Sequence, residues 1–258
     1  MKVIELTDKP QILAYLETDS LYAAYAIGDL EPGLFIHCTW FGAEQDGRLR
    51  AVALHYSGLG FPSVFLMGET DGLRAVFEDA LTIEQAYFTC RREHLGMMQD
   101  FYNWEPIPMW RMALRPESFR PVGDDGVPLA LDHAEQLGAL YAHGEGNAFD
   151  PKQVPGGAFH GVFEDGRLVA AAGTHLISPT YGVAAVGNVF THPDFRGRGY
   201  ATAATGAVVT ELWSRGMHAI VLNVNQKNET AIRIYERLGF ERCCPFFEGM
   251  ACVRATYS

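Results

Sequence analysis

Cysteine, positive charge and long apolar runs are all scarce in this sequence. Its 258 residues include five cysteines, and no pair has the spacing of a zinc site, so neither a disulfide scaffold nor a metal centre is expected. Lys and Arg number 20 against 31 Asp and Glu, and the net charge of −11 argues against broad nucleic-acid binding because phosphates would be repelled. No apolar run approaches the ~20 residues that span a bilayer, and the N-terminus lacks the apolar core of a signal peptide. We therefore expect a cytoplasmic protein with reduced, mostly buried thiols and with no nucleic-acid or membrane partner.

Apolar residues, by contrast, are plentiful enough to build large cores. The chain is 48% hydrophobic and 12% aromatic, which excludes a disordered or fibrous protein. Its length is ~1.7 times that of a typical ~150-residue domain, so one large or two small domains are expected.

A pattern repeated within the chain favours two domains. Residues 42–51 and 161–170 share the pattern Gly-x-x-x-Asp-Gly-Arg-Leu-x-Ala at an offset of 119. In both copies Asp-Gly stands between short apolar segments, which predicts a hairpin because both residues tolerate positive φ. A segment with helical periodicity precedes each hairpin, at 12–16 and at 129–141. The offset is near half the chain length and indicates two similarly built halves.

The boundary between the halves is expected in residues 115–126, where prolines, glycines and acids mark a connector. This gives a first domain over 1–120 and a second over 121–258. The fold class is α+β (mixed α/β), with two tandem domains, each a mixed, mostly antiparallel sheet flanked by helices. The expected strands are 63–67, 85–90, 107–114, 159–164, 167–175, 181–191, 219–224, 240–243 and 249–254, and the expected helices are 71–81, 200–215 and 228–238.

The segment after the strand that ends at Thr191 carries the clearest chemical signal. A turn at Pro193 is followed by Arg196-Gly197-Arg198-Gly199 and then by a helix rich in small residues. Glycines let the backbone approach a ligand, and the free amides and positive dipole of a helix N-terminus favour an anion such as a pyrophosphate. The loop is neither a Walker loop, since no Lys-Ser/Thr follows, nor a dinucleotide fingerprint, since the third glycine is missing.

These residues resemble the GNAT superfamily of N-acetyltransferases. Residues 196–201 fit its Arg/Gln-x-x-Gly-x-Gly/Ala loop, and residues 228–240 fit a second element, Asn-x-x-Ala-x-x-x-Tyr-x-x-x-Gly-Phe. The resemblance covers most of residues 127–255. The sequences of residues 187–191 and 161–163 are similar to those of the glycine-N-acyltransferase-like branch. It implies an acyl-CoA-dependent acetyltransferase that moves an acetyl or short acyl group to the amine of a small molecule or amino acid. The alternative is a non-catalytic acyl-CoA or metabolite sensor on the same fold.

The resemblance also implies which residues act. Tyr235 would protonate the departing CoA thiolate, which a phenol of pKa near 10 can do at neutral pH. Independently of the family, Asn228 is a good N-cap and Gly239 a good C-terminal stop for a helix whose apolar face carries Tyr235. The expected acetyl-CoA-binding residues are Val189, Phe190, Thr191, Arg196, Gly197, Arg198, Gly199, Tyr200, Ala201 and Asn228.

A general base is not assigned from the sequence. Many family members carry a carboxylate on the strand before the loop, where this chain offers Asn188, which cannot usefully accept a proton. Two alternatives to a direct general base stay open: a base that acts through a water molecule, and an acceptor amine that arrives unprotonated. The side chains that could serve are His143, Glu145, Asp150, His160 and His175.

The first half lacks the loop. At the equivalent place, Glu69 and Asp71 would repel a pyrophosphate, and no Arg-x-x-Gly spacing exists. We expect this half to be a related fold that does not bind the cofactor and that supplies packing and one wall of the acceptor site. Aromatic residues that either line this wall or pack in the core are Trp40, Tyr102, Trp104 and Trp110.

Overall fold

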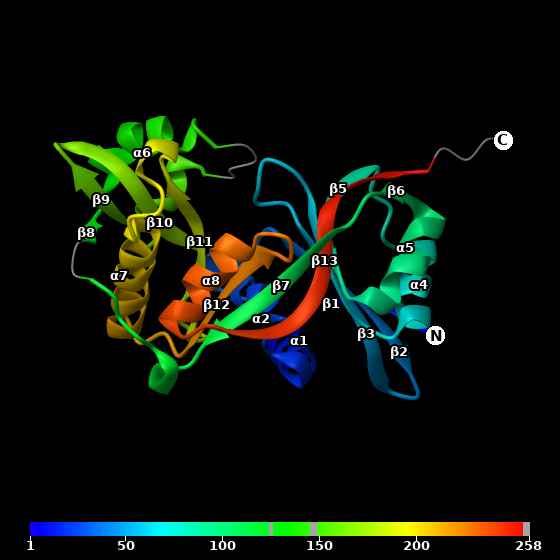
Figure 1. Ribbon diagram of the computed structural model, residues 1–258. Helices are drawn as coiled ribbons and strands as arrows, with labels where there is room; N and C mark the ends of the chain where they lie inside the picture. Colours follow the sequence, from blue (N-terminus) through cyan, green and yellow to red (C-terminus); the bar gives the residue numbers. More distant parts are fainter. Residues whose placement is uncertain (124–125, 145–148, 255–258) are drawn as a thin grey trace. The chain divides into compact units, whose positions relative to one another are not determined.

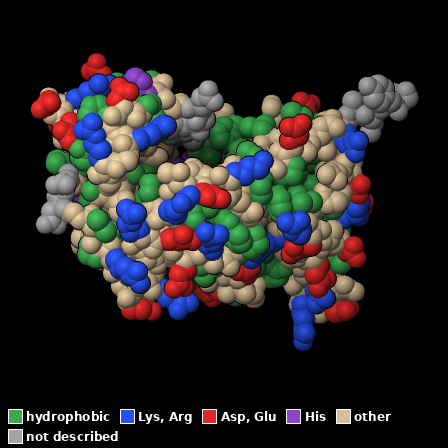
Figure 2. All heavy atoms as spheres, viewed as in Figure 1, with side chains coloured by type: hydrophobic (Ala, Val, Ile, Leu, Met, Phe, Trp, Pro, Cys, Tyr) green, Lys and Arg blue, Asp and Glu red, His purple; other side chains and the backbone are tan. Residues whose placement is uncertain are grey.

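The computed structural model describes residues 1–123, 126–144 and 149–254, which divide into two compact units. The first unit is Met1–Trp110 together with the chain from Cys244 onward, and the second is Arg111–Cys243. Each has a mostly antiparallel sheet with helices packed on it, so the predicted fold class is confirmed (Figure 1). On the face drawn in Figure 2, basic and acidic side chains are interleaved. No helix in the described part of the chain is long and apolar enough to cross a membrane.

The first unit orders its strands β1-β2-β3-β4-β5-β13, and β6 pairs with β13. Strands β1 to β4 pair antiparallel in turn, and β13 pairs antiparallel with both β5 and β6. Strands β4 and β5 are parallel. Helix α4 packs on β2 and β3, and its apolar side closes a core that includes Phe77, Phe88, Tyr102 and Trp104. The strands are β1 (Lys2–Leu6), β2 (Cys38–Gln45), β3 (Arg48–Tyr56), β4 (Ser63–Gly68), β5 (Gln85–Cys90), β6 (Tyr102–Trp104) and β13 (Glu241–Val253), and the helices are α1 (Lys9–Leu16), α2 (Ala24–Gly28), α3 (Pro32–Phe35), α4 (Thr70–Asp79) and α5 (Leu95–Phe101).

The second unit orders its strands β12-β11-β10-β9-β8, antiparallel except for β11 and β12. Helix α6 packs against β10 and β11, and helix α7 against β9, β10 and β11. Strand β7 (Ile107–Leu114) begins in the first unit and ends in the second. The remaining elements are β8 (Val127–Pro128), β9 (His160–Glu164), β10 (Arg167–Ser178), β11 (Val183–Thr191), β12 (Ala219–Asn225), α6 (Ala134–Tyr141), α7 (Tyr200–Ser214) and α8 (Glu229–Leu238).

Both units repeat one topology, as the internal sequence pattern predicts. The hairpin turns have left-handed residues at Asp46 and Gly47 (φ 52° and 73°) and at Asp165 and Gly166 (φ 48° and 77°). Positive φ at both central residues matches the right-handed twist of the paired strands. Each hairpin is followed by an antiparallel strand, a helix and a strand parallel to the one before it, as β2-β3-β4-α4-β5 and β9-β10-β11-α7-β12.

Three sequence expectations are wrong. The segment 240–254 is one strand rather than two, because Pro245 fits an extended backbone and the pairing with β5 runs unbroken from Phe247 to Cys252. The helix expected from 129 begins at Ala134, since the Leu129 N–H donates to Phe159 O at 2.7 Å and holds this residue against β9. All five cysteines are free, but they are not mostly buried: two are buried, one is half-buried and two are exposed.

Candidate functional site

The parallel strands β11 and β12 separate at the centre of the second unit. They pair only from Val183 to Val186, opposite Ala219 to Leu222, although β11 continues to Thr191. Beyond Val186 the facing backbone edges no longer bond to each other. A bulge adds to this, because β11 places Asn188 (φ 51°) and Val189 opposite a single residue of β10. The predicted backbone binders Val189, Phe190 and Thr191 lie, half-buried, on this separated edge.

Two polar side-chain atoms at this separation have no partner within the described residues. Thr191 Oγ1 is buried at the end of β11, and Asn223 Oδ1 is buried one residue past the last pair of β12. A buried polar atom without a hydrogen bond costs ~1–3 kcal/mol, so such atoms indicate a place for a polar ligand. Asn223 was not predicted from the sequence, because an Asn in an apolar strand gives no signal of its own.

The predicted glycine-rich loop joins β11 to α7 and presents its backbone amides outward. Gly197 and Gly199 have φ of 80° and 86°, and a Cβ at either would meet no atom within 4 Å. The first helical bond of α7 runs from the Ala203 N–H to Gly199 O at 3.1 Å. The N–H groups of residues 197–202 donate to no acceptor in the described chain. This exposed row of donors at a helix N-terminus is suited to an anion.

Arginine side chains and Tyr200 frame the loop. The Arg196 guanidinium lies 5.8 Å from the Phe190 ring and that of Arg198 lies 5.1 Å from the Phe195 ring, so both charges stay beside the amides. The Tyr200 hydroxyl donates to the Glu164 carboxylate, which ties the start of α7 to β9. Tyr200 and Ala201 therefore contribute backbone amides rather than side chains.

Helix α8 carries the two remaining predicted residues. Asn228 caps it, since Oδ1 accepts from the Ala231 N–H at 3.1 Å, and Gly239 ends it with φ of 101°. Tyr235 is buried on the face it shares with Ile232 and Leu238, and its ring packs on Phe240. Its hydroxyl bonds to no group among the described residues, and burial raises its pKa to about 12. The Tyr235 phenol is therefore protonated and neutral at physiological pH.

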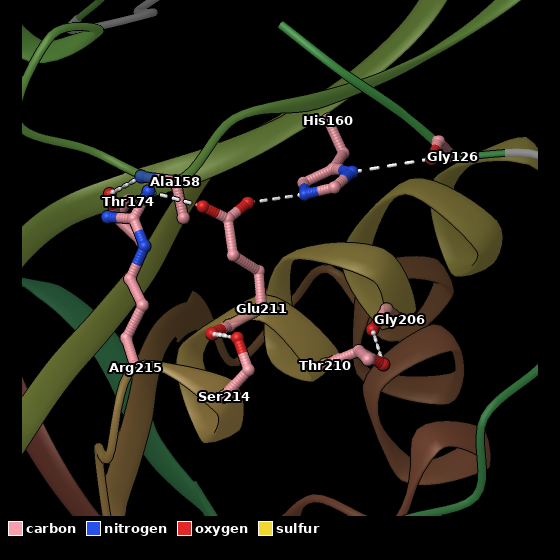
Figure 3. Close-up of polar contacts among 9 residues, drawn as sticks. All are labelled: Gly126, Ala158, His160, Thr174, Gly206, Thr210, Glu211, Ser214 and Arg215. Carbon is pink, nitrogen blue, oxygen red and sulfur yellow. Dashed lines mark hydrogen bonds and ion pairs between the residues drawn. The ribbon is translucent and has the colours of Figure 1, made fainter.

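Two of the five side chains considered as a general base are engaged elsewhere. Asp150 accepts from the Lys152 N–H at 2.9 Å and caps a short 3₁₀ turn. His160 lies on β9 with its Nε2 2.5 Å from Glu211 Oε2, in a cluster on the α7 side of the sheet that Arg215 completes (Figure 3). Glu145 lies outside the described residues.

His143 belongs to a separate groove. The groove, of about 330 Å³, is lined by α6, the β9–β10 turn and His192. The ring centroids of His143 and His192 are 4.3 Å apart, and Arg167 donates to His192 Nε2 at 2.7 Å.

A polar network missed by the sequence analysis surrounds the bulge. The Tyr141 hydroxyl donates to Asn188 O at 2.5 Å, and Asn188 Nδ2 donates to Gln153 Oε1 at 3.1 Å. His175, on β10, interacts with the Asn188 side chain. These residues come from four separate segments, so no local pattern joins them. No group of three or more His, Cys, Asp or Glu within 1–123, 126–144 and 149–254 is arranged to hold a metal ion.

Known proteins are similar to this chain in sequence and in fold. Residues 127–240 match the sequence model of the acetyltransferase (GNAT) family. A mycothiol acetyltransferase of Thermobispora bispora is 29% identical over 222 residues, which are 81% of this chain and 72% of that protein. A Drosophila protein of known structure has a TM-score of 0.75 at 11% identity, covering 98% of this chain and 99% of its own. A tandem GNAT protein from the clavulanic acid biosynthesis pathway has a TM-score of 0.59 at 12% identity, covering 100% and 99%. These two likenesses show the fold.

Proposed function

We propose that the protein transfers an acetyl group from acetyl-CoA to the amine of a small molecule or amino acid, because residues 127–240 match the sequence model of the acetyltransferase (GNAT) family. One observation carries the proposal: the part of β11 that no longer pairs with β12 is followed, through the glycine-rich loop, by a row of free amides at the N-terminus of α7. An extended pantetheine chain needs backbone partners, and the pyrophosphate that follows it needs an anion site. Along the chain of the second unit, the backbone partners on β11 come first and the anion site at the start of α7 follows.

Acetyl-CoA is held by the residues of the separation and the loop. The pyrophosphate binds the amides of residues 197–202, with Arg196 and Arg198 adding positive charge. The pantetheine amides pair with the backbone of residues 189–191, as an added strand would. Thr191 Oγ1 and Asn223 Oδ1 supply polar groups that are otherwise unpaired.

The chemistry needs an oxyanion site and a proton donor. A backbone N–H of the β11 bulge polarises the thioester carbonyl, and because it is fixed in place it needs no reorganisation as the oxyanion develops. Tyr235 protonates the CoA thiolate as it leaves. The similarity to a mycothiol acetyltransferase supports a small-molecule acceptor.

The first unit is a related domain without a cofactor. Strand β4 passes into α4 through Gly68 and Glu69, with no glycine-rich loop between them. A Cβ at Gly68 would lie 2.2 Å from the Tyr15 hydroxyl, so the place is filled, and Glu69 forms an ion pair with Arg50 at 2.5 Å. An anion would meet a carboxylate here instead of free amides.

The proposal is tested by measuring thiol release from acetyl-CoA with a panel of primary amines and amino acids. We expect amine-dependent release, and we expect acetyl-CoA at a hundredfold excess over its Kd to stabilise the fold by ~2.7 kcal/mol. If acetyl-CoA stabilises the fold but no amine causes thiol release, the alternative of a non-catalytic acyl-CoA sensor is favoured. The absence of both effects at millimolar acetyl-CoA would overturn the proposal.

A further inference from the structure

We infer that His175 is the general base that removes the proton from the acceptor amine, an inference that rests on the proposed acetyl transfer. The sequence offers several candidate bases, and the structure places this one at the point where β11 and β12 separate. The side chain comes from the neighbouring strand β10 rather than from β11 itself.

A bulge in β10 directs His175 toward β11. Thr174 pairs with Val186 and Leu176 with Ala185, so His175 is the extra residue between two consecutive pairs. Its imidazole lies over Gly187, where an added Cβ would be 2.3 Å from both Cε1 and Nε2. The missing side chain of Gly187 is thus what makes room for the ring.

The position of Gly187 places the His175 imidazole next to the backbone that is proposed to bind acetyl-CoA. It is the first residue of β11 beyond the last pair with β12, and it immediately precedes the bulge. The ring therefore borders the backbone that the pantetheine and thioester occupy in the proposed function. The imidazole is also solvent-exposed, so an acceptor can reach it.

The surroundings of His175 keep the imidazole neutral. Although His175 is exposed on one side, the protein atoms around it reduce its hydration and lower its pKa, and the hydrogen bond with Asn188 offsets this only in part. Asn188 is held in turn by two contacts: its backbone carbonyl accepts from the Tyr141 hydroxyl, and its Nδ2 donates to Gln153 Oε1. Asn188 thus acts as a positioning residue for the imidazole.

The proton and electron changes balance with His175 and Tyr235 in these roles. The ammonium form of the acceptor gives one proton to the neutral imidazole, and the free amine attacks the thioester carbonyl. The C–N bond forms, the C–S bond breaks, and the Tyr235 hydroxyl protonates the thiolate. The second nitrogen proton, lost as the amide forms, restores the tyrosine, and His175 returns its proton to water.

The test compares His175→Gln with His218→Gln in the full-length protein. His218 is a matched control, because its ring is also exposed and also lies over a glycine, with a Cβ at Gly182 falling 2.2 Å from its Nε2. Gly182 precedes β11 at the end opposite the separation. We expect His175→Gln to lower kcat/KM by about 10²–10⁴-fold with an unchanged acetyl-CoA Kd, and His218→Gln to leave both unchanged.

The pH profile separates a base from a merely structural histidine. For a primary amine, wild-type kcat/KM should level off above the pKa of His175, which lies below 6.5. The His175→Gln profile should instead keep rising, about tenfold per pH unit, until the amine itself deprotonates. A variant with wild-type rates and profile would overturn the assignment and leave the proposed function intact. Failure of the wild type to release thiol with any amine would instead contradict the proposed function.

Discussion

At the scale of single residues, burial keeps the Tyr235 phenol protonated. The ring packs on Phe240, and the hydroxyl bonds to no described group. With its pKa raised to about 12, the phenol is protonated throughout the pH range in which the protein would work. Substitution of the hydroxyl alone removes the donor without exposing the core.

Tyr235→Phe should lower kcat by about 10²–10⁴-fold while the Kd for acetyl-CoA stays unchanged. Because no hydrogen bond is lost, the free energy of unfolding should change by less than about 0.5 kcal/mol. Steady-state kinetics, a binding titration and thermal unfolding check the three expectations. Wild-type turnover by the variant at saturating substrates would make Tyr235 a core residue only.

At the scale of elements, helix α7 has a left-handed glycine beyond each end. Gly199 caps its start with φ of 86°, and Gly216 follows its end with φ of 82°. A Cβ at either glycine would meet no atom within 4 Å, so both positions require glycine for the backbone angle alone. The two differ in what they present: free amides at the start, and carbonyl groups at the end.

Gly199→Ala and Gly216→Ala should therefore each cost ~1–2 kcal/mol of stability, the penalty for a left-handed alanine. Only Gly199→Ala should also weaken acetyl-CoA binding, because it disturbs the amides of the loop. Chemical denaturation and a binding titration on the same two variants give the comparison. Equal loss of affinity in both would show that helix stability, not the loop, controls binding.

At the scale of the whole molecule, two units share a topology but only one has the loop. In the second unit, eight residues separate β11 from α7, whereas in the first unit Glu69 alone separates β4 from α4. A chain of net charge −11 must concentrate its positive charge locally to bind a polyanion, and Arg196 and Arg198 do so beside the free amides. A buried carboxyl group in the first unit, that of Asp29, makes the free energy of unfolding depend on pH.

Asp29, which caps the end of α2, illustrates that dependence. Burial raises its pKa to about 7, so the folded state holds this proton more tightly than the unfolded chain does. Stability from this group is complete below about pH 4 and is lost as the pH rises to about 7. Asp29→Asn should therefore stabilise the protein at pH 8, on the order of 4 kcal/mol, and change little at pH 4. Denaturant unfolding at both pH values measures this, and an equal effect at each would contradict it.

The sequence by itself determined the features that depend on near neighbours. The Asp-Gly hairpins, the Asn228 cap and the Gly239 stop are fixed by backbone angles and bonds within about four residues. The amide row of residues 197–202 follows from glycines placed before a helix, so the loop too could be predicted.

Tertiary structure alone decided which distant residues meet. His175 reaches Gly187 because β10 carries a bulge, and a bulge is a mismatch between two strands that neither strand's sequence encodes. Asn223, whose buried Oδ1 has no partner among the described residues, lies next to the point where β11 and β12 stop pairing. The last strand, β13, pairs with β5 in the first unit although the chain before it belongs to the second. Pairing between strands far apart in the chain depends on burial of the whole sheet, and a local pattern does not carry that information.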